Sequence, residues 1–184
     1  MDSGSSQSHS QTKIEMIDEQ IKQLVLTKDK YQSEAALMVD SYWDEWKEEN
    51  KRIHSMRQNI GDKDYVHTGR LAPRVYSPPN THRVYIEWWD FRKHALRIKI
   101  KSFGVRIKPT KKGYTWSCVS KHANAWEKKF FIKYETPFKR IRESTNLICD
   151  NINTLNKVKR IHLKHIAKLN ESINIKTNEE YTNG

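Results

Sequence analysis

The sequence lacks the features that mark membrane, metal and catalytic proteins. No apolar run approaches the ~20 residues needed to cross a bilayer, and the N-terminus has no apolar signal segment. The two cysteines, Cys118 and Cys149, stand far apart without metal-ligand spacing, which favours free thiols in a reducing compartment. There is no glycine-rich phosphate loop and no nucleophile elbow. We therefore expect a soluble, cytoplasmic protein that uses no metal or cofactor.

Candidate catalytic groups are equally sparse. His162 and His165 stand three residues apart, which places two imidazoles on one helix face, but a solvated helix surface explains this spacing better than a metal site does. The carboxylates of Glu87 and Asp90 belong to no pattern that would hold a metal, and loop or turn roles are favoured for them. A nuclease or relaxase would need such a cluster, so we expect a protein without enzymatic activity.

Acidic residues are scarce in the middle of the chain. Residues 51–142 contain 23 Lys and Arg but only 6 Asp and Glu, a balance of +17. Residues 1–50 have a balance of −6 and residues 143–184 one of +1, so the total of +12 arises in the middle. This concentration is expected of a surface that faces a polyanion, and nucleic acid is the first partner to consider.

Two segments have apolar residues at alternating steps of three and four, the spacing of a heptad seam. Residues 12–58 are expected to form one long helix, whose seam comprises Ile14, Ile17, Ile21, Leu24, Tyr31, Ala35, Met38 and Tyr42. Residues 122–170 are expected to form helices with a break near Pro137, because proline suits the first turn of a helix. The second seam comprises Phe138, Ile141, Thr145, Ile148, Ile152, Leu155, His162, Ile166 and Leu169.

The matched lengths of the two helical segments favour an antiparallel pair within one chain. A homodimer formed through the same seams is the alternative. Residues 1–11 and 171–184 are polar, and we expect flexible tails there.

Residues 65–120 alternate as β-strands do. The apolar positions of the successive runs are Val84, Ile86, Trp88, Ile98, Ile100, Val105, Ile107, Tyr114, Trp116 and Cys118. The sequence thus predicts an α+β fold in which a small antiparallel β-sheet of three to five strands is flanked by two long helices forming an antiparallel coiled-coil-like pair. One face of the sheet is expected to be apolar and the other basic.

The basic positions of these strands are the candidate DNA contacts. Alternate residues of a strand project from one face about 6.6 Å apart, close to the separation of successive phosphates in a duplex. The candidates are Arg83, Arg97, Lys99, Lys101, Arg106, Lys108, Lys111 and Lys112, and no acidic residue occurs between Arg97 and Lys112. Double-stranded DNA is therefore the predicted partner.

Aromatic residues lie among these charges. Trp88 and Trp116 are in phase with the aliphatic residues and are expected in the core, whereas Trp89 is out of phase and is a candidate to stack on unpaired bases. Trp43 and Trp46 lie beside the first seam and are expected to fasten the first helix to the sheet.

Five fragments occur in the order and rough spacing of a known family. They are SYWDEWKEEN, GRLAPRV, IEW, AWE and PFKRIR, within residues 40–145. In these fragments the chain resembles the MobI-type conjugative transfer proteins, relaxosome accessory factors of integrative conjugative elements and large plasmids. The resemblance implies a non-catalytic protein that helps a separate relaxase act at the origin of transfer. It also makes Arg70 and Arg74 of the second fragment candidate DNA contacts.

Two other functions remain open on sequence alone. The same basic and aromatic surface would suit an RNA-binding or single-strand-binding protein. The heptad seams would suit a coiled-coil adaptor or scaffold whose basic patch meets an acidic protein.

Overall fold

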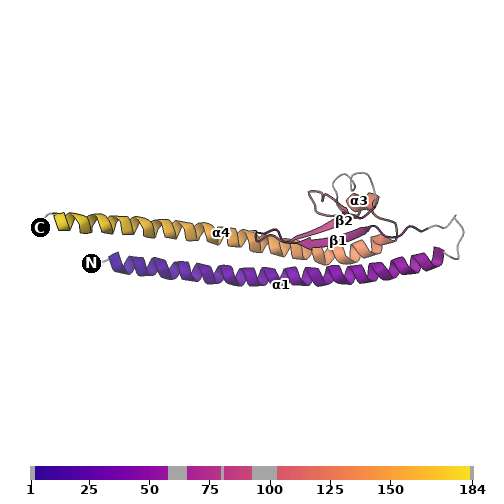
Figure 1. Ribbon diagram of the computed structural model, residues 1–184, viewed down its shortest axis with the longest axis horizontal. Coiled ribbons are helices and arrows are strands. Elements are labelled where there is room, and N and C mark those ends of the chain that lie inside the picture. Colours follow the sequence, from indigo (N-terminus) through magenta and orange to yellow (C-terminus); the bar gives the residue numbers. More distant parts are fainter. Residues whose placement is uncertain (1–2, 58–65, 80, 93–102, 183–184) are drawn as a thin grey trace. The chain divides into compact units, whose positions relative to one another are not determined.

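The computed structural model describes residues 3–57, 66–79, 81–92 and 103–182. In chain order the elements are α1 (Ser3–Arg57), β1 (Leu71–Tyr76), β2 (Tyr85–Asp90), β3 (Val105–Arg106), α3 (Trp116–Val119), the 3-10 helix η2 (Ser120–His122) and α4 (Glu127–Thr182) (Figure 1). This is the α+β fold that the sequence predicts, with two long helices and a small antiparallel sheet.

The chain forms two compact units. The helical unit comprises Met1–Lys28 and Leu147–Gly184, and the sheet unit comprises Asp29–Asn146. Each unit contains one part of α1 and one part of α4.

The helical unit buries part of each predicted seam. Ile14 and Ile17 of α1 are buried, as are Ile148 and Ile152 of α4. Lys159 occupies a seam position of α4 and binds Asp18 of α1, with 2.5 Å between Nζ and Oδ1. The ion pair allows a lysine at a position that heptads normally give to an apolar residue.

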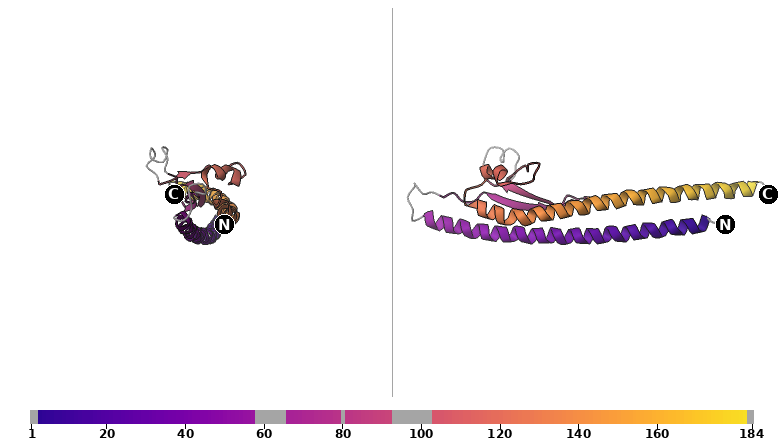
Figure 2. Two further views of the ribbon diagram at one scale, coloured as in Figure 1. Left: turned by 90° about the vertical axis from the view of Figure 1, so that its right-hand side faces the viewer. Right: turned by 180° about the vertical axis from the view of Figure 1, so that it is seen from behind.

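The sheet unit is built around three antiparallel strands in the order β1-β2-β3. Pro73 of β1 is the Cα partner of Trp88 in β2, so both belong to the face that meets the helices. Trp88 Nε1 donates to Glu135 of α4 at 2.8 Å, and the hydroxyl of Tyr42 in α1 donates to the carbonyl of Leu71 at 2.5 Å. Figures 1 and 2 show β1 and β2 lying beside the first half of α4.

Aromatic side chains fill the core of the sheet unit. Tyr42 is fully buried and its ring centre lies 5.6 Å from that of Trp88, 5.2 Å from Tyr134 and 6.0 Å from Phe130, each edge to face. Such pairs contribute about 0.5–1.5 kcal/mol beyond their buried area. The predicted core position of Trp88 is confirmed, since its exposure is 0%.

Both tryptophans beside the seam link α1 to the rest of the sheet unit, Trp43 next to the end of β2, as predicted, and Trp46 at the start of α4. Trp43 lies edge to face with Phe91, at 5.6 Å between ring centres. Trp46 donates its indole N–H to Glu127 at 3.2 Å.

The predicted helix break near Pro137 is wrong. Helix α4 runs without interruption from Glu127 to Thr182, with Pro137 inside it. Proline removes one backbone hydrogen bond at this point. Phe131 and Tyr134 before it, and Phe138 and Ile141 after it, are all buried. Burial of apolar side chains on both sides therefore keeps the two parts in one helix.

Two further expectations differ from the structure. The run Tyr114–Trp116–Cys118 was expected as a strand, but Trp116–Val119 form the short helix α3. Its first turn closes locally, because the Cys118 N–H donates to the Thr115 carbonyl at 3.1 Å. Residues 3–11 and 171–182 continue α1 and α4 in place of irregular tails. Extending a formed helix costs far less than starting one, so polar residues follow a packed segment into the helix.

Candidate nucleic-acid interface

The turn that follows β3 presents three of the predicted cations. Thr110 and Gly113 exchange backbone hydrogen bonds of 3.0 and 2.9 Å, and Gly113 has a φ of 88°, which glycine adopts without steric cost. Lys111 and Lys112 form the tip of this turn, and Lys108 precedes it. All three lysines are exposed, and none forms an ion pair with a carboxylate of the described residues. Their charges are therefore available to a polyanion.

Arg106 of β3 is partly compensated. Its side chain is 48% exposed, and Nη2 lies 2.8 Å from Oε1 of Glu87, which is 3% exposed. A guanidinium has five N–H donors, so Arg106 keeps donors that can reach a phosphate. Glu87 comes from the neighbouring strand β2, and the sheet face that was expected to be basic thus includes one buried carboxylate.

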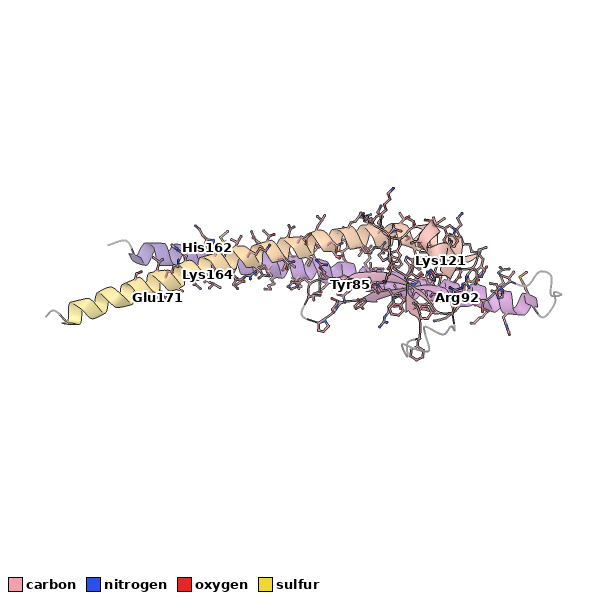
Figure 3. All side chains as sticks on the ribbon, turned by 90° about the horizontal axis from the view of Figure 1, so that it is seen from above. Tyr85, Arg92, Lys121, His162, Lys164 and Glu171 are labelled. Atoms are coloured by element: carbon pink, nitrogen blue, oxygen red, sulfur yellow. The ribbon has the colours of Figure 1, made fainter. Side chains whose placement is uncertain are left out.

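The same face of the sheet carries stacked side chains, among them Tyr85 of β2, which is labelled in Figure 3. Arg74 is the Cα partner of Glu87, and Tyr76 is that of Tyr85, so all four share one face. The exposed guanidinium of Arg74 lies over the ring of Trp89, 5.1 Å from its centre. The rings of Tyr76 and Tyr85 stack at 5.1 Å and 17°. This outer face is therefore aromatic and cationic rather than purely basic.

The other predicted contacts divide into two groups. Arg83 is exposed just before β2, and its carbonyl accepts a hydrogen bond from Ser77 at 2.9 Å. Arg97, Lys99 and Lys101 lie outside the described residues, as does the strand expected there. Their contacts with DNA stay predictions.

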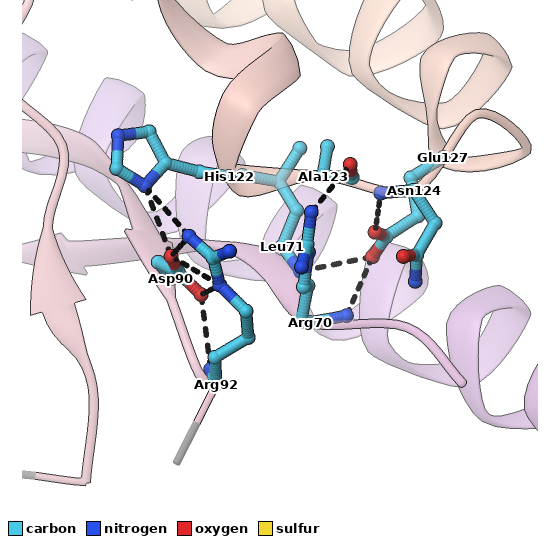
Figure 4. A network of polar contacts seen from close by, with 8 residues as sticks. All are labelled: Arg70, Leu71, Asp90, Arg92, His122, Ala123, Asn124 and Glu127. Carbon is cyan, nitrogen blue, oxygen red and sulfur yellow. Dashed lines mark hydrogen bonds and ion pairs between the residues drawn. The ribbon is translucent and has the colours of Figure 1, made fainter. Parts of the chain in front are cut away.

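Arg70 is positioned within a polar network (Figure 4). Its Nη2 donates to the carbonyl of Ala123 at 2.9 Å, and its backbone N–H donates to Glu127 at 2.8 Å. Burial, followed by the nearby charge of Arg92, lowers the pKa of the Arg70 guanidinium. Arg70 thus joins the start of β1 to the residues that precede α4, and its contact with DNA stays a prediction.

Glu127 is the centre of that network. Its side chain is fully buried, and Oε1 accepts the backbone N–H groups of Arg70 and Leu71 at 2.8 Å each and the indole N–H of Trp46 at 3.2 Å. Oε2 accepts the backbone N–H of Asn124 at 2.7 Å. Burial raises the pKa of Glu127 above its usual value, although all four hydrogen bonds oppose this.

A second buried carboxylate fixes the end of β2. Asp90 is 1% exposed and accepts hydrogen bonds from the backbone N–H of Arg92 at 2.9 Å and from its guanidinium (Figure 4). The Nδ1 of His122 in η2 lies 2.9 Å from Asp90 Oδ2. Burial alone would raise the pKa of Asp90, but the hydrogen bonds from Arg92 and His122 outweigh it and lower that pKa.

Sequence reasoning missed the roles of both carboxylates. Asp90 is in phase with the buried residues Ile86 and Trp88, and an acid at such a position indicates a buried, hydrogen-bonded group. Glu127 follows Asn124 by three residues, the spacing of a capping box at a helix start. These two signals were present in the sequence.

Within the described ranges, no group of three or more His, Cys, Asp or Glu side chains is placed to hold a metal ion. The long helices are also too polar to span a bilayer over the part of the chain that the structure describes.

These features define the class of the protein: a small α+β protein whose sheet unit exposes lysines with no carboxylate partner in the described part of the chain, and has a face of stacked aromatic and arginine side chains. The family model described as MobI protein matches residues 31–156, and the chain belongs to the MobI family. The resemblance inferred from the five fragments is thereby confirmed. Membership suggests an accessory protein of conjugative mobilisation. Neither the curated proteins nor the solved structures give a significant match.

Proposed function

We propose that this chain is a non-catalytic accessory protein that binds double-stranded DNA at an origin of transfer and helps a relaxase act there. The observation that supports this most is the exposed turn with Lys108, Lys111 and Lys112, three charges with no carboxylate partner among the described residues. Family membership supplies the process, conjugative mobilisation. The lysines supply the reason to expect a polyanion.

Binding through phosphates has a quantitative signature. Each neutralised phosphate releases counterions, and six to ten such contacts lower the affinity by about 10³–10⁵ between 50 and 200 mM salt. Arg74, Arg83 and Arg106 are exposed and, together with the three lysines, supply six cations among the described residues. We therefore expect the affinity for DNA to fall by about 10³ between 50 and 200 mM salt.

The experiment removes the three lysines and follows the salt dependence. The variant K108A/K111A/K112A should bind a transfer-origin duplex more weakly, with the slope of log affinity against log salt reduced by about 3, one for each lost phosphate contact. The measurement is fluorescence anisotropy of a labelled duplex at several salt concentrations.

A matched control makes the same charge change elsewhere. Lys157, Lys164 and Lys168 are exposed on α4 in the helical unit (Lys164 is labelled in Figure 3). The variant K157A/K164A/K168A should keep the wild-type slope. Equal slopes for the wild type and both triple variants would show that the turn does not contact DNA.

A protein partner is also part of the proposal. The helical unit exposes large apolar side chains, with Met16 60%, Leu147 67% and Ile161 66% exposed. We propose this surface as the contact for a relaxase or another relaxosome protein, with a homodimer as the competing use.

A further inference from the structure

A groove in the sheet unit has a mainly aromatic lining. It encloses about 480 Å³, within the ~300–1,000 Å³ of small-molecule sites. Its lining includes four aromatic side chains and two charged ones, Trp43, Trp89, Phe91, Phe103, Arg74 and Asp40. We refer to it as the aromatic groove.

The aromatic groove is ready to accept a flat ring. Phe103 is 84% exposed, far more than an apolar side chain of this size usually is. Trp43 and Phe91 already meet edge to face at 5.6 Å, and both pack against the core, which holds their positions. The walls are thus partly rigid, and Phe103 is the aromatic side chain with the most surface to cover.

Its polar groups select a neutral ring with hydrogen-bonding edges. The carboxylate of Asp40 is exposed and would repel a phosphate, but it accepts hydrogen bonds from the N–H groups of a base. The indole Nε1 of Trp89 is buried and has no hydrogen-bond partner among the described residues.

The groove adjoins the proposed DNA surface. Trp89 is the Cα partner of Arg106 in the β2–β3 ladder, and Arg74 lies over the Trp89 ring. A nucleic-acid strand held by these arginines would therefore have its bases next to the groove.

We infer that the aromatic groove binds one unpaired nucleobase of the DNA that the basic turn holds. This inference rests on the proposed function and deepens it, because it names DNA with an unpaired base, rather than perfect duplex, as the preferred ligand. Stacking of one base on an aromatic side chain contributes about 5- to 150-fold in affinity.

The test compares two probes of equal length, a perfect duplex and the same duplex with one bulged nucleotide, at fixed salt. The wild type should prefer the bulged probe by at least about fivefold. The variants F103A and D40A should lower this preference. Their affinity for the perfect duplex should stay within about twofold of that of the control variant. Both positions are exposed, so neither change disturbs the core. The control is I132A, at an exposed apolar residue of α4 that does not line the groove.

The outcomes separate the inference from the proposed function. If the wild type binds both probes equally well, or if F103A and D40A keep the full preference, the groove does not hold a base, and duplex binding still stands. If neither probe binds, both the inference and the proposed function fail.

Discussion

At the scale of single residues, Glu127 stabilises the sheet unit more than any exposed charge can. Its buried carboxylate accepts three backbone N–H groups, from Arg70, Leu71 and Asn124. Each buried donor that loses its acceptor costs about 1–3 kcal/mol. We expect E127A to lower the free energy of unfolding by at least about 3 kcal/mol, measured by urea denaturation.

The conservative variant refines this prediction. E127Q keeps one carbonyl acceptor but turns an amide donor toward the other N–H groups, so its loss should be smaller than that of E127A. The control is E143A on the same helix, where the side chain is 65% exposed and the change should stay within about 0.5 kcal/mol. An E127A protein as stable as E143A would contradict the role given to this network.

Asp90 makes stability depend on pH with a definite sign. Its pKa in the folded protein lies below the usual 3.8, so folding favours the ionised carboxylate. The contribution of Asp90 to the free energy of unfolding is complete above about pH 3.8 and is lost as the pH falls through the lowered pKa. The free energy of unfolding of the wild type should therefore fall more steeply in acid than that of D90N.

Urea denaturation at a series of pH values below 5 measures this difference. The variant D44N removes an acid whose side chain is 77% exposed and should keep the wild-type acid dependence. Parallel acid limbs for the wild type and D90N would rule out the proposed contribution of Asp90.

The residue scale is also where the sequence was least informative. The exposed lysines of the turn could be predicted, because no acid is near them in the chain. The pairing of Arg106 with Glu87 could not, since the ion pair joins two strands whose register only folding sets. The hydrogen-bond partners of Arg70 could not be predicted either, since Ala123 and Glu127 lie more than 50 positions away in the chain.

At the scale of elements, Pro137 is the clearest departure from local rules. A proline in a helix interior costs about 3 kcal/mol relative to alanine, in part through the lost hydrogen bond. We expect P137A to raise the free energy of unfolding by about 1–3 kcal/mol, the lower value allowing for a more flexible unfolded chain. Thermal or urea unfolding measures it.

The neighbouring exposed position Lys139 provides the comparison, since K139A should change stability by less than about 0.5 kcal/mol. A P137A protein that is less stable than the wild type would show that the proline ring or a bend at this point is needed for packing.

Elements with long periodic patterns were predicted well. The two heptad seams correctly predicted long helices, because apolar residues that recur on average every 3.5 residues do not fit the period of two of a strand. The run at Tyr114, Trp116 and Cys118 was too short for its period to distinguish a strand from a helix. The backbone hydrogen bond from Cys118 to Thr115 starts a helical turn there.

At the scale of the whole molecule, the exposed apolar surface of the helical unit is the feature that predicts association. Glutamates in place of Met16, Leu147 and Ile161 should abolish binding to a partner, since each would bury an unpaired charge in the contact. Light scattering tells whether the wild type forms a dimer that the triple variant loses. Co-precipitation with a purified relaxase tests the proposed partner.

The sheet unit provides the internal check on this result. The triple glutamate variant should keep its affinity for duplex DNA if DNA binding by the sheet unit does not depend on association. If the wild type and the triple glutamate variant are both monomeric and the variant still binds the relaxase, the partner contact lies elsewhere.

The sequence by itself determined the two long helices, the basic middle segment and the MobI family, because periodicity, charge balance and short motifs are local properties that survive without knowledge of the fold. Only the tertiary structure decided which of these charges are compensated, that Glu127 and Asp90 are buried acceptors, and that four aromatic side chains line one groove. Burial and pairing depend on contacts between residues distant in the chain, and no local pattern specifies those.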